Sequence, residues 1–145
     1  MIPAHITNTR GITERILEHI FLGEVSPDRR RRGRVKVKGF HCNLDYNDTV
    51  VEIVPGTPIV YVDNITGLFE ASVRDKRTHT LKRHTSTFFN QNWSRQKVVD
   101  CIADATSNPQ NIVRDSINGN NAYLDRKTGV VVVPVGNTVY PIPFH

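Results

Sequence analysis

Histidine is the side chain in this sequence best suited to proton transfer near neutral pH. The six histidines are His5, His19, His41, His79, His84 and His145. Two of them have specific surroundings. His19 stands in the last turn of an expected helix, shortly before Gly23, where the negative end of the helix dipole favours the protonated ring. His41 follows Gly39 at the end of a basic strand pattern. These two are therefore the first candidates for acid–base chemistry.

Metal-ion chemistry has no counterpart in the motifs of this chain. There is no HExxH motif, no CxxC pair and no pair of carboxylates on one helix face. Cys42 and Cys101 match neither a zinc nor a redox spacing, so we expect free thiols in a reducing compartment. We therefore expect no metal and no cofactor, and look for acid–base catalysis by side chains alone.

Cleavage of RNA needs only such side chains, because RNA carries its own nucleophile, the 2′-hydroxyl. One group must remove that proton, and a second must protonate the leaving 5′-oxygen. A fixed cation must offset the charge that develops around phosphorus. The chain has 145 residues, a formal charge of +5 and a pI near 9.5. This balance favours a polyanion, whether nucleic acid, an anionic membrane surface or an acidic protein, without choosing among them.

The hydrophobic periodicity predicts two helices and many strands, and hence an α+β fold in one domain. The helices are expected at 13–22, with Thr13 as N-cap, and at 93–106, with Asn92 as N-cap. Strands are expected at 34–38, 49–54, 57–62, 68–74, 80–89, 122–125, 130–135 and 138–142. Loops are expected around the arginine run at 29–32 and over 116–121.

Four segments, in this order, resemble the motifs of EndoU-type endonucleases, the group that includes bacterial EndoU domains and the coronavirus uridylate-specific endonuclease. They are the HxxxG element at 19–23, KGFH at 38–41, STFF with NWS at 86–94, and TVYP at 138–141. Each is weak alone, but together they span nearly the whole chain. The sequence departs from the bacterial pattern at Asn90, where proline is usual, and at Cys42, where a second histidine is common.

The resemblance implies a role for each matching residue. His41 would be the general base on the 2′-hydroxyl, His19 the general acid, and Lys82 the cation near the phosphate. The implied substrate-binding residues are Ser86, beside uracil, and Thr138 and Tyr140, on phosphate, ribose or base. The implied activity is a lyase-type RNA endonuclease that prefers uridine, requires no metal and leaves a 2′,3′-cyclic phosphate. The implied fold is a single EndoU-like domain over residues 1–145, in which two small antiparallel sheets line a cleft and residues 1–10 are loosely ordered.

Alternatives remain open at several positions. His84 rivals Lys82, because the two would share one face of a strand over 80–89. Thr138 and Tyr140 could be ordinary cross-strand packing. The arginine run at 29–32 is either a solvated charge run or a track for the RNA backbone. The aromatic residues Phe88, Phe89 and Trp93 are expected in the core rather than stacked on bases.

The function itself also has alternatives. A non-catalytic RNA-binding module, or a protein that binds an acidic partner such as an immunity protein, would have the same basic composition. We expect single-stranded RNA as partner and no membrane, since no apolar run approaches the length of a span. The expected location is the cytoplasm, as a standalone ribonuclease, or the cytoplasm of a target cell, as a toxin domain.

Overall fold

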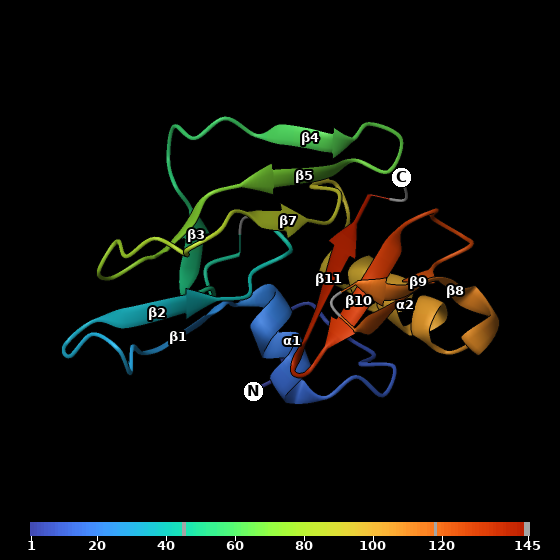
Figure 1. Cartoon of the computed structure of the whole chain (residues 1–145), viewed down its shortest axis with the longest axis horizontal. Helices are drawn as coiled ribbons and strands as arrows, with labels where there is room; N and C mark the ends of the chain where they lie inside the picture. Colours follow the sequence, from blue (N-terminus) through green and yellow to red (C-terminus); the bar gives the residue numbers. More distant parts are fainter. Residues whose placement is uncertain (45, 118, 144–145) are drawn as a thin grey trace.

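The computed structural model describes residues 1–44, 46–117 and 119–143. Two α-helices lie among short strands (Figure 1). The helices are α1 (Glu14–Phe21), α2 (Arg95–Thr106) and the short 3-10 turn η1 (Pro109–Asn111). The strands are β1 (Glu24–Pro27), β2 (Val35–Lys38), β3 (Val51–Ile53), β4 (Val60–Asp63), β5 (Leu68–Ala71), β6 (Val73–Asp75), β7 (Ser86–Phe88), β8 (Ile112–Ile117), β9 (Asn120–Leu124), β10 (Val131–Val135) and β11 (Thr138–Ile142). No helix of the described part is long and apolar enough to cross a membrane.

The strands form antiparallel ladders only, which confirms the predicted α+β class. Among the described residues they divide into four ladders rather than the two sheets expected: β1-β2, β3-β6, β4-β5-β7 and β11-β10-β9-β8. The β1-β2 hairpin projects to one side, and α1 lies between this hairpin and β11 (Figure 1).

Helix α1 begins and ends as the sequence predicts. The Thr13 hydroxyl accepts a hydrogen bond from the backbone N–H of Ile16 at 3.3 Å, which caps the first turn. Leu17, Ile20 and Phe21 lie completely buried on one face. Gly23 then adopts a φ of +77° and packs directly on Val51, so a side chain at this position would clash. The last turn of α1, which carries His19, is thus fixed by core packing and a glycine stop.

The second helix starts two residues later than expected. Ser94, not Asn92, is the N-cap of α2, and its hydroxyl accepts from the N–H of Lys97 at 3.1 Å. Asn92 instead donates its N–H to the side chain of Asn90 at 2.9 Å. Asn90 therefore closes the local turn through its side chain.

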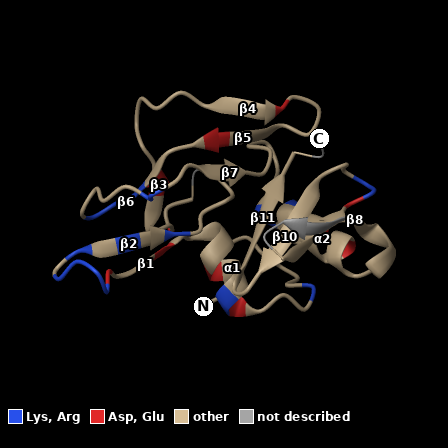
Figure 2. Ribbon diagram, viewed as in Figure 1, with Lys and Arg blue, Asp and Glu red and all other residues tan. Residues whose placement is uncertain are grey.

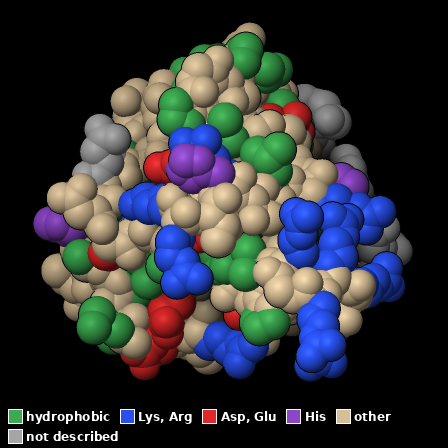
Figure 3. Space-filling model, turned by 90° about the vertical axis from the view of Figure 1, so that its left-hand side faces the viewer, with side chains coloured by type: hydrophobic (Ala, Val, Ile, Leu, Met, Phe, Trp, Pro, Cys, Tyr) green, Lys and Arg blue, Asp and Glu red, His purple; other side chains and the backbone are tan. Residues whose placement is uncertain are grey.

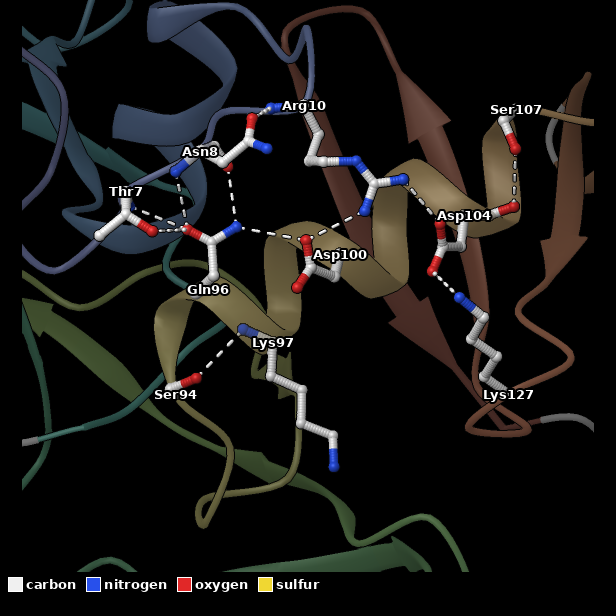
Figure 4. A network of polar contacts seen from close by, with 10 residues as sticks. All are labelled: Thr7, Asn8, Arg10, Ser94, Gln96, Lys97, Asp100, Asp104, Ser107 and Lys127. Atoms are coloured by element: carbon white, nitrogen blue, oxygen red, sulfur yellow. Dashed lines mark hydrogen bonds and ion pairs between the residues drawn. The ribbon is translucent and has the colours of Figure 1, made fainter.

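The N-terminal segment lies along α2 (Figure 4). The backbone N–H groups of Thr7 and Asn8 donate to the Gln96 amide oxygen at 2.9 and 3.0 Å. Arg10 contacts Asp100 at 3.1 Å and Asp104 at 2.7 Å. These contacts tie residues 7–10 to the helix surface opposite the core.

The predicted strand over 80–89 is wrong in extent. Only Ser86–Phe88 forms β7, and Leu81 makes an isolated bridge to Arg74. The Lys82 N–H donates to the Val73 carbonyl at 2.9 Å, after which the chain bends away from the ladder. Because 82–84 is not a continuous strand, the argument that Lys82 and His84 share a strand face does not hold.

The glycine- and asparagine-rich segment at 116–121 contains more strand than the sequence predicts. Strands β8 and β9 extend into 116–121 from both sides, and Asn118 lies outside the described residues. The sequence likewise predicts a loop around Pro27, whereas the structure has strand β1 there. It pairs along its whole length with β2, and Pro27 is its last residue, where a missing N–H is tolerated.

Candidate active site

His19 and His41 come together because the chain leaving β2 runs along the last turn of α1. The N–H of Phe40 donates to the His19 carbonyl at 3.0 Å, and the N–H of His41 donates to the Ile20 carbonyl at 2.8 Å. Gly39 makes this approach possible. A Cβ on Gly39 would lie 2.8 Å from Cδ2 and 3.0 Å from Nε2 of the His19 ring, and still closer to its carbonyl oxygen. Gly39 also has a φ of +75°, so only glycine fits at this position.

His41 is held as a neutral imidazole with one nitrogen free. Its side chain is buried, and Nδ1 lies 2.8 Å from the Thr87 carbonyl oxygen. A carbonyl oxygen can only accept, so Nδ1 carries the hydrogen and Nε2 keeps its lone pair. Burial, reinforced by the positive charge of Lys82, lowers the pKa of His41 to about 3. At neutral pH the ring is therefore a proton acceptor.

His19 is paired with a carboxylate that the sequence interpretation overlooked. Its Nδ1 lies 3.0 Å from Oε2 of Glu24, five residues along the chain. Burial is the largest influence on this ring and lowers the pKa of His19, while Glu24 acts against burial and Lys82 reinforces it. The helix dipole alone had suggested a ring favoured in its protonated form, and the net effect here is the opposite.

Lys82 is the cation at this place. Its ammonium group donates to the Ser86 hydroxyl at 2.7 Å and to the Gly39 carbonyl at 3.2 Å. Burial lowers the pKa of Lys82 to about 8, so the group is still mainly charged at neutral pH. The Ser86 hydroxyl also lies 3.3 Å from the Gly39 carbonyl. The structure thus brings Lys82, rather than the exposed His84, to the backbone that joins the two histidines.

Tyr140 and Thr138 stand two residues apart on β11, so they share one face of that strand. The Tyr140 ring lies 6.3 Å from the His41 ring, centroid to centroid, at an angle of 36°. Burial raises the pKa of the Tyr140 phenol. The Thr138 hydroxyl oxygen is buried and has no hydrogen-bond partner among the described residues. An unpaired buried hydroxyl is uncommon and suits a site that a ligand completes.

The other histidines lie elsewhere. His5 stacks on Tyr46, at 4.8 Å between ring centroids, and His79 is exposed in a turn after β6. His145 lies outside the described residues. The aromatic residues expected in the core are there: Phe88 and Phe89 are fully buried and Trp93 nearly so.

Chemically, the arrangement combines a neutral imidazole able to accept a proton, a second imidazole supported by a carboxylate, and an ammonium group that acts on both. In the described part of the chain, no group of three or more His, Cys, Asp or Glu side chains is arranged to hold a metal ion. What the three groups could do together is to move protons on either side of an anion held by the ammonium group.

Comparison with known proteins places this arrangement in a family. The model of the family described as bacterial EndoU nuclease matches residues 13–143. The chain belongs to the bacterial EndoU nuclease family. It is also similar to a protein of Bacillus cereus named "Toxin", with 32% identity over 108 residues. That match covers 74% of this chain and 18% of the Bacillus protein, so the chain corresponds to a small part of that relative. No solved structure matches the chain.

As a member of the bacterial EndoU nuclease family, the chain belongs to a family of nucleases. Glu24, whose carboxylate contacts His19, could have been found from the sequence. Gly23 ends α1 with a left-handed turn that folds the chain back on itself. The residue that follows such a turn returns to the last helical turn, where His19 lies.

Proposed function

We propose that this domain is an RNA endonuclease that cuts after uridine by attack of the 2′-hydroxyl and leaves a 2′,3′-cyclic phosphate. The observation that carries the proposal is the pair of unlike imidazoles. His41 keeps a free Nε2, while His19 has a carboxylate on Nδ1, and Lys82 influences both rings. One ring is thus suited to take a proton and the other to give one.

In the proposed reaction, Nε2 of His41 removes the proton of the 2′-hydroxyl, and the 2′-oxygen forms a bond to phosphorus. The bond from phosphorus to the 5′-oxygen breaks, and that oxygen takes a proton from His19. Lys82 donates a hydrogen bond to a non-bridging phosphate oxygen, where negative charge increases. The negative phosphate would also raise the affinity of both imidazoles for protons, bringing them closer to the working pH. The products are a cyclic phosphate and a free 5′-hydroxyl, and no metal takes part.

The uridine would lie between β7 and β11. The Ser86 hydroxyl already accepts from Lys82, so it is fixed in place for a hydrogen bond to the base. The Thr138 hydroxyl has its hydrogen-bonding capacity unused. The half-exposed Tyr140 ring, next to His41, offers a face against which ribose or base can pack.

The direct test is to digest a defined oligonucleotide containing a single uridine and to analyse the product ends. We expect one cut, a 2′,3′-cyclic phosphate on the uridine, and the same rate in the presence of EDTA. A 3′-phosphate formed without a cyclic intermediate, or equal cutting after all four bases, would contradict the proposal. Retarded migration of RNA without any product over hours would favour a non-catalytic RNA-binding module instead.

The toxin name of the Bacillus relative supports a second level of the proposal. We propose that the domain acts on RNA in the cytoplasm, either its own cell's or a target cell's, and that an acidic immunity protein blocks its basic face in a producing cell. Loss of viability on expression, prevented by inactivation of the site, would support the toxin role.

Glu24 gives a prediction for the pH dependence of cleavage. Its carboxylate raises the pKa of His19 against the effect of burial. In Glu24→Gln the amide oxygen can still accept from Nδ1, but the negative charge is gone, so the pKa of His19 should fall further. An acid must be protonated to act. The alkaline limb of the kcat profile should therefore move to lower pH, with activity several-fold lower at pH 7 and largely recovered in acid.

Glu18→Gln is the matched control for this experiment. Glu18 lies on α1 and lines the same small surface pocket as His19 and Glu24, but it pairs with the N-terminal ammonium group at 3.5 Å. Its profile should follow that of the parent. A loss in Glu24→Gln that is the same at every pH would assign Glu24 a structural role only.

A further inference from the structure

A groove next to the candidate site extends well beyond the residues that the proposed reaction uses. It has a volume of about 1270 Å³ and runs between the β1-β2 hairpin and the segment at 80–84. This volume exceeds that of pockets for single small molecules, which are roughly 300–1,000 Å³. Its size suits a chain of linked units better than one compact ligand.

The lining of the groove is strongly basic. It includes eight lysines and arginines against two carboxylates, those of Glu24 and Asp28. Glu24 faces His19, and Asp28 accepts the N–H of Arg30 within the hairpin turn at 2.9 Å. Figure 2 shows this charge along β2 and at the tip of the hairpin, and Figure 3 shows Lys and Arg side chains gathered on the same face. An unbranched polyanion is the ligand that such a lining recognises.

The arginine run supplies the outer end of this lining. Arg29, Arg30 and Arg31 line the groove and are exposed, whereas Arg32 does not belong to the lining. The hairpin register is regular from Glu24↔Lys38 to Pro27↔Val35, so the strands hold the arginine turn at a fixed distance from the histidines.

The inner end of the groove reaches the candidate site on one side only. Glu24, Lys38 and Lys82 line it, and Glu24 contacts His19. Tyr140 lies beside His41 on β11 and is not part of the lining. The lining thus contacts His19 through Glu24, whereas none of the lining residues belongs to β11. In the proposed reaction His19 protonates the 5′-oxygen, which belongs to the nucleotide on the 3′ side of the cut.

We propose that the groove binds the RNA backbone on the 3′ side of the cut, with Arg29, Arg30 and Arg31 contacting phosphates several nucleotides downstream. This inference rests on the proposed function, since it uses the role of His19 to set the direction. It makes the preferred substrate an RNA that continues well beyond the cleaved uridine, and it assigns the arginine run to substrate binding.

The test compares two oligonucleotides with one uridine each. One carries roughly six adenosines on the 3′ side of uridine and the other roughly six on the 5′ side with a single 3′ adenosine, a length within known single-strand site sizes. In the triple variant Arg29→Ala, Arg30→Ala, Arg31→Ala, kcat/KM should fall about tenfold or more for the 3′-extended RNA at moderate salt. It should change less than about twofold for the 5′-extended RNA. The plot of the logarithm of the binding constant against the logarithm of salt concentration should become less steep by about 2, since each lost phosphate contact on a single strand contributes roughly 0.7.

The matched control removes the same charge outside the lining, in Arg32→Ala, Lys76→Ala, Arg77→Ala. These side chains are exposed and do not line the groove. This variant should retain the parent's preference for the 3′-extended RNA. Equal losses in both triple variants would mean that only overall charge matters, and would overturn the proposal. An equal loss of kcat/KM on the 5′-extended RNA in the groove variant would also overturn it. No loss of kcat/KM on either RNA would overturn it as well, and would leave an acidic protein as the occupant of the groove.

Binding of the same RNAs with 2′-deoxyuridine at the cut, followed by fluorescence anisotropy, separates this inference from the proposed function. The 2′-deoxy RNAs cannot be cut by the proposed reaction. If the parent cuts RNA but its binding does not depend on the groove arginines, the groove inference is wrong and the proposed function stands. If the parent binds the 3′-extended RNA through these arginines but does not cut it, the proposed function is wrong and the groove inference stands.

Discussion

Replacing His41 with asparagine is expected to lower kcat for a uridine-containing RNA by about 10²- to 10⁴-fold, the range for loss of a positioned acid or base. The asparagine amide nitrogen takes the position of Nδ1 and can still donate to the Thr87 carbonyl, as Nδ1 of His41 does at 2.8 Å. It has no nitrogen that can accept a proton. His41→Asn therefore removes the proton acceptor and preserves the buried hydrogen bond, so that a loss of rate does not merely report a loss of folding.

His19→Ala should have an effect of the same size, because both proton transfers belong to one displacement. The double variant should be little slower than either single variant, since residues that act as a unit are not additive. His79→Ala is the control, because this side chain is exposed and does not line the groove. Rates for His41→Asn and His19→Ala equal to that of the parent, measured by stopped assays on a fluorescent oligonucleotide, would remove the basis of the proposed function.

The elements with strong periodicity were predictable from the sequence. The buried face of α1, its Thr13 cap and the Gly23 stop all follow from local physical chemistry, and the structure has them. The valine-rich strand β10 and the alternating strand β11 likewise need no tertiary information to be recognised. The resemblance to the EndoU family was also visible in four motifs, and the match over residues 13–143 confirms it.

What the sequence could not supply came from tertiary contacts. The strand at 80–89 was predicted too long because a β-branched pattern does not reveal where a ladder partner ends. The bend after Lys82 is set by the hydrogen bond to Val73 and by the approach of Lys82 to Gly39. The proximity of His19 and His41 depends on backbone hydrogen bonds between the residues that follow β2 and the last turn of α1. The spacing of residues in the sequence does not predict these bonds. The division into four ladders has the same origin, since strands this short pair where neighbours allow.

Removal of Lys82 is expected to lower kcat by about 10²- to 10³-fold, the effect of losing one preorganised group that stabilises developing negative charge. The ammonium group is partly buried between Ser86 and Gly39, where water cannot replace its charge well. KM for a short RNA should change much less than kcat, because the charge on the phosphate oxygens rises in the transition state. Initial rates of Lys82→Ala over a range of RNA concentrations give both constants.

The same variant should also change the pH profile, and the direction follows from the sign of the charge. Lys82 lowers the pKa of both His19 and His41, so without it both pKa values should rise. His41 then needs a higher pH to become the free base, and His19 keeps its proton to a higher pH, so the whole bell-shaped pH profile of kcat moves to higher pH.

Lys38→Ala is the matched variant. It removes a cation that acts on His19 but is exposed and, among the described residues, makes no side-chain hydrogen bond to Ser86 or Gly39. It should move only the alkaline limb and leave kcat within about threefold at its optimum. If His84→Ala reduced kcat more than Lys82→Ala, the cation of the site would have to be reassigned to His84.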